Sequence, residues 1–239
     1  MMLGARTAAW AKSGGGVPTA KDYVQDGLIA MWDGIENAGW GVHDPNATVW
    51  KDLVKGLILK RTNGENVWND DSAVFDGNNN NVMSVNFSIL RDAVYGGSLT
   101  IESVFHPTDS TFKGNNALMS YGGDTSRAIW IWGTDCIFTY RKSNNKNAGA
   151  ISNDADNQMT FSSEGVYKAG VRLSNVIQGT ASDSDDNLIV GRIPFYYTQI
   201  GNYNAFRGLI KSLRFYNRAI SSAEIVANYA IDKARFNLP

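Results

Sequence analysis

The stretch FRGLIKSLRFYNRAISSAEIVANY, residues 206–229, decides the fold. Its first half alternates apolar and polar residues and predicts a β-strand. Asn217 and Arg218 predict a turn. Ser221 and Glu224 have the spacing of a capping box, so a helix is expected from there to about Lys233. The chain is therefore expected to close on a strand–turn–helix unit.

Strict alternation divides this strand into two faces. One face is made by Leu209, Lys211, Leu213 and Phe215, and the other by Ile210, Ser212, Arg214 and Tyr216. The first face is expected to pack between two sheets, and the mixed second face to line a concave or partly solvated surface. The helix is expected to cover an edge of the sheet, where unpaired backbone groups would otherwise be exposed.

Short strand patterns recur along the rest of the chain, separated by Gly, Asn and Asp. They are expected at Gly27–Asp33, 57–60, Ser72–Asp76, 82–85, Leu99–His106, Ala117–Tyr121, Ala128–Trp132, Cys136–Arg141, 158–161, Val166–Arg172 and 193–200. A short helical turn capped by Asn86 is expected at 86–94. This pattern predicts an all-β fold, a two-sheet antiparallel jelly-roll sandwich with a short C-terminal helix.

Composition narrows the functional classes. The chain has 22 basic and 23 acidic residues in 239, a net charge of −1, which gives no global electrostatic reason to bind nucleic acid or an anionic membrane. The single Cys136 excludes an internal disulfide framework and a cysteine-based zinc site. No stretch is long and apolar enough to predict membrane insertion or a secretory leader.

The chain is expected to comprise two parts. Residues 1–22 form a tail with a flexible hinge at Ser13–Pro18, and this tail is a candidate anchor to other proteins. Residues 23–239 are expected to form one β-sandwich domain, since no second linker follows.

The closing stretch resembles the end of laminin-G-like domains, within the concanavalin A-like lectin and glucanase superfamily. The residues that match are Phe206, Gly208, Ile210, Leu213, Arg214, Tyr216, Asn217, Arg218, Ala219, Ser221, Glu224, Ile225, Asn228 and Tyr229. The segment from Gly27 to Gly34 resembles the first strand of these domains, and Ala73–Gly77 resembles their FDG turn. The resemblance spans about residues 23–236 and implies a concanavalin A-like jelly roll.

The same superfamily contains glycosidases, but the sequence gives no catalytic pattern. Related glucanases carry two or three carboxylates on one strand in an E-x-D-x-(x)-E pattern, and none of the five Glu residues has Asp two positions later. His43 and His106 lack a neighbouring nucleophile and are expected to be structural. The chain is therefore expected not to be an enzyme, with a glycoside hydrolase of unrecognised active site as an alternative.

Aromatic side chains offer the best candidates for ligand binding, because sugars stack on exposed rings. Trp130 and Trp132 share one face of their strand, and Ile129 and Ile131 share the other. Either the tryptophans line an open face or they belong to the core, and the sequence leaves both open. The secondary candidates are Tyr196, Tyr197 and Tyr203.

Calcium is the one metal that the resemblance implies, since many laminin-G-like domains hold an ion at a loop rim. The candidate oxygen ligands are Asp76, Asn78, Asp183 and Asp185. Turn formation explains the same residues, because Asp and Asn are common in turns. No other cofactor motif is present.

Three hypotheses of function follow. The first is a non-catalytic adhesion or display module on a phage or prophage virion, made in the host cytoplasm, whose tail joins other virion or surface proteins and whose sandwich binds surface glycans. The second is a secreted or cell-surface carbohydrate-binding module, and the third is the glycoside hydrolase named above. Self-association into a homo-oligomer is compatible with each of them.

Overall fold

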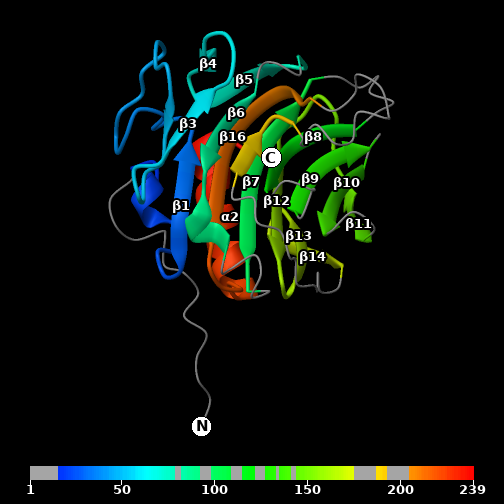
Figure 1. The fold of residues 1–239 in the computed structure, drawn as a ribbon. Coiled ribbons are helices and arrows are strands. Elements are labelled where there is room, and N and C mark those ends of the chain that lie inside the picture. Colours follow the sequence, from blue (N-terminus) through cyan, green and yellow to red (C-terminus); the bar gives the residue numbers. More distant parts are fainter. Residues whose placement is uncertain are drawn as a thin grey trace.

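A computed structural model of the chain describes most of its length. The described residues are 16–78, 82–91, 98–108, 115–121, 127–132, 135–140, 144–174, 187–192 and 205–239. They form two antiparallel β-sheets and one C-terminal α-helix, α2 (Figure 1). The expected all-β sandwich with a short C-terminal helix is confirmed.

The first sheet has the strand order β14-β13-β12-β7-β16-β5-β4, and β1 also pairs with β16. Its strands are β1 (Leu28–Asp33), β4 (Trp68–Asn69), β5 (Ser72–Asp76), β7 (Thr100–Pro107), β12 (Asn157–Ser162), β13 (Gly165–Lys168), β14 (Val171–Ser174) and β16 (Arg207–Tyr216). The ten-residue β16 pairs with β7 on one side, and with β5 and then β1 on the other. It is therefore the centre of this sheet.

The second sheet has the order β11-β10-β9-β8-β15-β6-β3-β2. Its strands are β2 (Trp50–Lys51), β3 (Ile58–Arg61), β6 (Met83–Asn86), β8 (Asn115–Tyr121), β9 (Arg127–Trp132), β10 (Asp135–Tyr140), β11 (Asn144–Ala150) and β15 (Asn187–Val190). Figure 1 shows β9, β10 and β11 together at one side of the molecule and β3 and β4 at the other.

The main hydrophobic core lies between the two sheets. At its centre, Phe87 packs edge-to-face on Trp32 of β1 and Phe215 of β16, with ring centroids 5.6 and 5.4 Å apart. Phe87 follows β6, so this cluster joins the second sheet to the middle of the first. Fully buried aromatic rings each remove a large apolar area from water and dominate the stability of such a core.

A β-bulge in β16 corrects the expected division of its faces. The register with β7 shifts between Ile210 and Ser212, so the extra residue Lys211 interrupts the alternation. Ile210 consequently belongs to the core between the sheets together with Leu213 and Phe215. The prediction placed Ile210 on the opposite face because it assumed strict alternation of side chains, and an alternating pattern cannot reveal a bulge.

Gly208 of β16 occupies a place that no other residue fits well. Its φ is +145°, and a Cβ there would lie 2.2 Å from the carbonyl oxygen of His106 on β7. The close approach of two backbones therefore requires glycine at this position of the closing stretch.

Helix α2 (Ser222–Phe236) covers the outer face of the first sheet rather than its edge (Figure 1). Its side chains contact the central strands β16 and β7, and Ile225, Ile231 and Phe236 are buried against them. The sequence had predicted that the second face of β16 lines a concave or partly solvated surface. This prediction is wrong, because the helix excludes water from that face. The expected N-cap is confirmed, since Ser221 and Glu224 form a capping box.

A buried ionic network joins α2 to the sheet. The guanidinium of Arg214 donates to Glu102 of β7 at 3.0 Å and to both carboxylate oxygens of Asp232 of α2 at 2.8 and 2.6 Å. Asn228 donates to Glu102 at 2.7 Å, and the Tyr23 hydroxyl donates to Asp232 at 2.8 Å. These side chains are almost completely buried, so each charge depends on its partners for solvation.

Several local elements differ from the sequence prediction. The polar segment Asn144–Ala150, which has the composition of a turn, forms the edge strand β11 because it pairs with β10. The expected strand 166–172 is divided into β13 and β14 by a turn at Ala169 and Gly170, both with positive φ. The turn after β6 is the 3-10 helix η3 (Ser88–Leu90), with Phe87 rather than Asn86 at its N-cap.

The end of the expected tail packs on the sandwich. Ala20 is completely buried in η2 (Ala20–Asp22), and the Pro18 carbonyl accepts a hydrogen bond from Arg235 of α2. Residues 1–15 lie outside the described part of the chain.

The ionic network makes a testable prediction. Replacing Arg214 by Met leaves Glu102 and Asp232 buried without a cation, so the free energy of unfolding should fall by about 3–5 kcal/mol. Arg207, exposed on the same strand, is the control, and Arg207→Met should cost less than about 1 kcal/mol. Urea denaturation measures both. Equal losses in the two variants would contradict the role given to Arg214.

Candidate ligand-binding site

The two candidate tryptophans lie in β9 of the second sheet. Trp130 is paired with Ala117 of β8 and Ile137 of β10, and Trp132 is the last residue of the strand. The structure describes the backbone of β9, whereas the side chains of Trp130 and Trp132 lie outside what it describes. The choice between an open face and the core therefore stays a prediction.

Five other candidates lie outside the described residues. These are Tyr196, Tyr197 and Tyr203 of the aromatic set, and Asp183 and Asp185 of the calcium set. Their role in binding stays a prediction.

Asp76 and Asn78, the remaining calcium candidates, are exposed at the end of β5. The Asp76 carboxylate accepts the backbone N–H of Asn78 at 2.9 Å, the arrangement of an Asx turn. Within the described ranges, no cluster of three or more His, Cys, Asp or Glu residues could hold a metal ion. The calcium site stays a prediction that the turn alone does not support.

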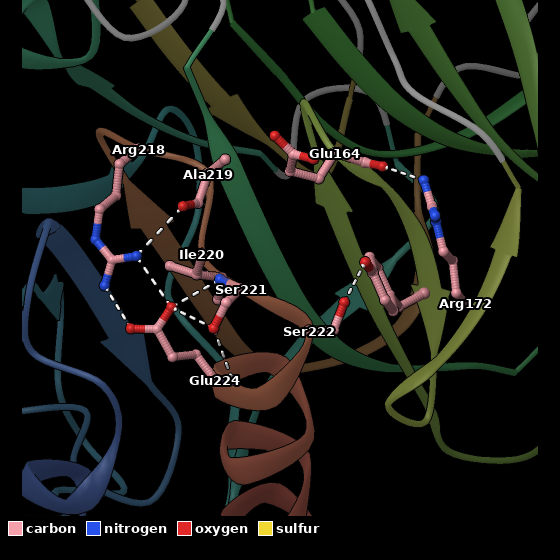
Figure 2. Close-up of a pocket in the computed structure, with 9 residues that line it drawn as sticks. Glu164, Arg172, Arg218, Ala219, Ile220, Ser221, Ser222 and Glu224 are labelled. Carbon is pink, nitrogen blue, oxygen red and sulfur yellow. Dashed lines mark hydrogen bonds and ion pairs between the residues drawn. The ribbon is translucent and has the colours of Figure 1, made fainter. Parts of the chain in front are cut away.

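A polar pocket lies between the β13–β14 hairpin and the segment that joins β16 to α2 (Figure 2). It has a volume of about 430 Å³. The lining residues are Glu164, Tyr167, Arg172, Arg218, Ala219, Ile220, Ser221, Ser222 and Glu224. Six of these nine come from the closing stretch of sequence, so the strand–turn–helix unit forms one wall of the pocket.

An ion pair makes up the charged side of the pocket. Arg218 donates to the two carboxylate oxygens of Glu224 at 3.0 and 2.7 Å (Figure 2). Its Nε also forms an ion pair with Asp26 at 3.0 Å. The bonds from Arg218 to Glu224, together with those from Ser221, lower the pKa of Glu224 to about 2. Glu224 is therefore ionised at neutral pH and cannot serve as a general acid there.

Hydroxyl and guanidinium groups line the opposite wall. The Tyr167 hydroxyl lies 2.9 Å from the Ser222 hydroxyl, and Arg172 donates to the Glu164 carbonyl at 2.6 Å (Figure 2). Positive and negative groups are balanced, so the pocket offers hydrogen bonds to a neutral polar molecule rather than a net charge. Sequence reasoning missed Arg172, because nothing local brings β14 to the start of α2.

Two carboxylates with raised pKa values lie deep in the protein. Burial raises the pKa of Asp33 to about 6, which the neighbouring Arg235 only partly offsets, and burial also raises the pKa of Glu102. Arg235 Nη2 lies 2.9 Å from Asp33 Oδ1 without the geometry of a hydrogen bond, so this contact is an ion pair. Both carboxylates have 0% exposure, which removes them from contact with a ligand.

One exposed aromatic residue was not among the predicted site residues. Trp40 is 39% exposed, whereas Trp32, Trp50 and Trp68, the other tryptophans whose burial the structure describes, are at most 9% exposed. The signal was present in the sequence, since Trp40 lies between two glycines in AGWGV, a composition typical of a tight turn.

Comparisons with known proteins identify the fold. A scan against protein-family models found no matching family, and a search of curated proteins found no match. Solved structures do match, among them three whose sequence identity to this chain is low. A sialidase from Trypanosoma rangeli in complex with sialic acid has a TM-score of 0.64 and 16% identity, over 94% of this chain and 35% of that chain. The chain thus spans about a third of the length of that sialidase.

Two further structures are separate domains. The receptor-binding domain of botulinum neurotoxin type G has a TM-score of 0.64 and 12% identity, over 87% of this chain and 52% of that chain. Domain 4 of AbnA, a GH43 extracellular arabinanase from Geobacillus stearothermophilus, was solved in complex with arabinotriose. It has a TM-score of 0.60 and 15% identity, over 85% of this chain and 98% of that domain. These likenesses show a shared β-sandwich fold that is compatible with the concanavalin A-like expectation.

No helix within the described ranges is long and apolar enough to cross a membrane.

The pKa of Asp33 makes stability depend on pH in a specific way. Its folded-state pKa of about 6 is above the usual 3.8, so its contribution to stability is fully present below pH 3.8 and is lost as the pH rises through 6. Two pKa units correspond to at most about 3 kcal/mol. Urea denaturation measures the free energy of unfolding at pH 4 and pH 7. Between these pH values, wild type should lose up to about 3 kcal/mol more of this free energy than Asp33→Asn does. The same pH dependence in both proteins would contradict the assignment.

Proposed function

We propose that the protein is a non-catalytic, lectin-like module that binds glycans for adhesion or display. The observation that carries the proposal is its likeness to domain 4 of the arabinanase, which extends over 85% of this chain and 98% of that domain. That domain was solved with arabinotriose bound, so a sandwich of this size and shape is sufficient to bind an oligosaccharide. A sequence identity of 15% indicates a shared fold only. The position of a binding site must therefore be inferred from the residues of this chain.

The backbone register supports the open-face alternative for β9. Met119 of β8 belongs to the core between the sheets and is directly paired with Ile129. Paired positions of antiparallel strands lie on the same face, and successive positions alternate. This alternation along β9 supports a place for positions 130 and 132 on the face of the second sheet that is turned away from the first. We propose that Trp130 and Trp132 bind a sugar there by stacking.

Three described carboxylates with shifted pKa values fit the proposed role without catalysis. A retaining glycosidase needs two carboxyl groups about 5–5.5 Å apart beside the substrate, one of them able to donate a proton. Asp33 and Glu102, whose raised pKa values would suit a general acid, have no exposed surface. Glu224, which does line a pocket, is held ionised by Arg218. A hydrolase stays the alternative, and release of reducing sugar from a bound glycan would establish it.

We further propose that the sandwich is laminin-G-like and is displayed on a phage or prophage virion through residues 1–16. The support is the order of the sequence, a short tail and a triple-glycine hinge before the domain. Display on a cell surface or secretion as a carbohydrate-binding module is the alternative. Either location uses the same glycan-binding face.

Binding is tested on a glycan array, with and without calcium. We expect wild type to bind at least one glycan, and Trp130→Ala and Trp132→Ala each to weaken that binding by about tenfold, the effect of losing one stacked ring. Val226→Ala, which truncates an exposed side chain on α2, is the control and should bind like wild type. If the protein binds no glycan on the array, the proposal is wrong and a purely structural role is favoured.

Display is tested by deleting residues 1–16. The truncated protein should fold and stay soluble, because the described contacts of the N-terminal segment with the sandwich begin at Pro18. It should no longer join the particle or surface to which the full chain attaches, as measured by co-sedimentation. Normal incorporation of the truncated protein would overturn the anchoring role.

A further inference from the structure

Trp40 lies at the tip of a tight, rigid turn. The backbone N–H of Val42 donates to the Gly39 carbonyl at 2.9 Å, and that of Ala38 donates to the Val42 carbonyl at 3.2 Å. Gly39 and Gly41 have φ values of +136° and +70°, which residues with a side chain rarely adopt. The two glycines therefore allow the chain to present one large indole between them.

A buried carboxylate fixes this turn to the rest of the protein. Glu36 accepts the backbone N–H of Gly41 at 2.8 Å and that of Ala20 in η2 at 3.1 Å, and it pairs with Arg235 of α2 at 3.2 Å. One carboxylate thus holds the turn, the N-terminal segment and the C-terminal helix in a fixed relation. Such support fixes the backbone that carries the exposed ring, and a site whose backbone is already in place costs less entropy to bind a ligand.

Two lysines lie near the turn, Lys21 beside the Trp40 ring and Lys51 beside Gly39. The Lys21 ammonium lies 5.5 Å from the centroid of the Trp40 ring, and Lys51 Nζ would lie 3.9 Å from a Cβ at Gly39. The Lys51 backbone is tied to the same loop by a hydrogen bond from its N–H to the Asn37 carbonyl. Within the described part of the chain, neither lysine forms a salt bridge with an acidic residue. Both ammonium groups are therefore available to an anion.

We propose that Trp40, Lys21 and Lys51 form a second glycan site, specific for acidic sugars. The indole supplies a flat apolar surface for the C–H groups of a pyranose ring, and the ammonium groups bind its carboxylate or sulfate. The inference rests on the proposed glycan binding and adds the charge class of the ligand and the place where it binds. The near-neutral chain favours a short acidic sugar over a long polyanion such as nucleic acid, which needs an extended basic surface.

The experiment is calorimetric titration with four probes. Trigalacturonate carries carboxylates, a heparin-derived tetrasaccharide adds sulfates, maltotriose is neutral, and a four-residue oligothymidylate is an acidic non-sugar. We expect wild type to bind one or both acidic sugars more tightly than maltotriose, and the stronger of the two identifies the anionic group. Trp40→Ala should weaken that binding by about tenfold and leave its salt dependence unchanged.

The lysine variants give the complementary result. Lys21→Ala and Lys51→Ala should each weaken binding by about two- to fivefold at low salt and reduce its dependence on salt. Lys233→Ala on α2 removes the same charge from an exposed position on another element, and it should change neither the affinity nor its salt dependence. Circular dichroism of each variant checks that the fold is intact.

The outcomes separate the two proposals. Acidic-sugar binding that survives Trp40→Ala, or binding of maltotriose alone, overturns the Trp40 site while the glycan-binding function stands. Tighter binding of the oligothymidylate than of either acidic sugar overturns the assignment to sugars. Absence of binding to all three sugars, here and on the array, overturns both proposals.

Discussion

The architecture depends on one buried cation. Arg214 lies at the centre of the first sheet, and its guanidinium bridges Glu102 on the neighbouring strand and Asp232 on α2. Charges in such a place are costly unless every hydrogen-bonding group is satisfied. The geometry that satisfies them leaves one position for the helix, across the outer face of β16 and β7. Burial by itself lowers the pKa of the guanidinium, but the charges of Asp232 and Glu102 outweigh this desolvation and raise the pKa, so Arg214 stays protonated.

This arrangement directs where a ligand can bind. With α2 over the outer face of the first sheet and the aromatic core on its inner face, neither face of its central strands is open. The outer face of the second sheet, the outer strands of the first sheet and the turns at the rim are the remaining surfaces. The polar pocket at the start of α2 belongs to the same strand–turn–helix unit that organises the fold, and Arg218 there mainly fixes Glu224 and the helix cap.

Local signals in the sequence predicted more of the fold than of the site. The capping box at Ser221 and the existence of the strand before it depend on neighbours along the chain, and both are confirmed. The bulge at Lys211 and the pairing of Arg214 with Glu102 depend on β7, more than a hundred residues away along the chain, so no local pattern could reveal them. Trp40 combines a local signal with contacts that are distant in the sequence. Its glycines indicated a turn, but its exposure depends on Glu36 contacts made across the fold.

The most direct test of glycan binding observes the tryptophans themselves. The chain has seven, and each indole N–H gives one nitrogen–proton NMR signal that a Trp→Phe variant assigns. Completely buried Trp32 and Trp50 serve as internal references. On titration with trigalacturonate, we expect the Trp40 signal to shift progressively while those of Trp32 and Trp50 stay fixed. If no indole signal moves with this sugar, with the heparin tetrasaccharide or with maltotriose, the account of the protein as a glycan-binding module is wrong.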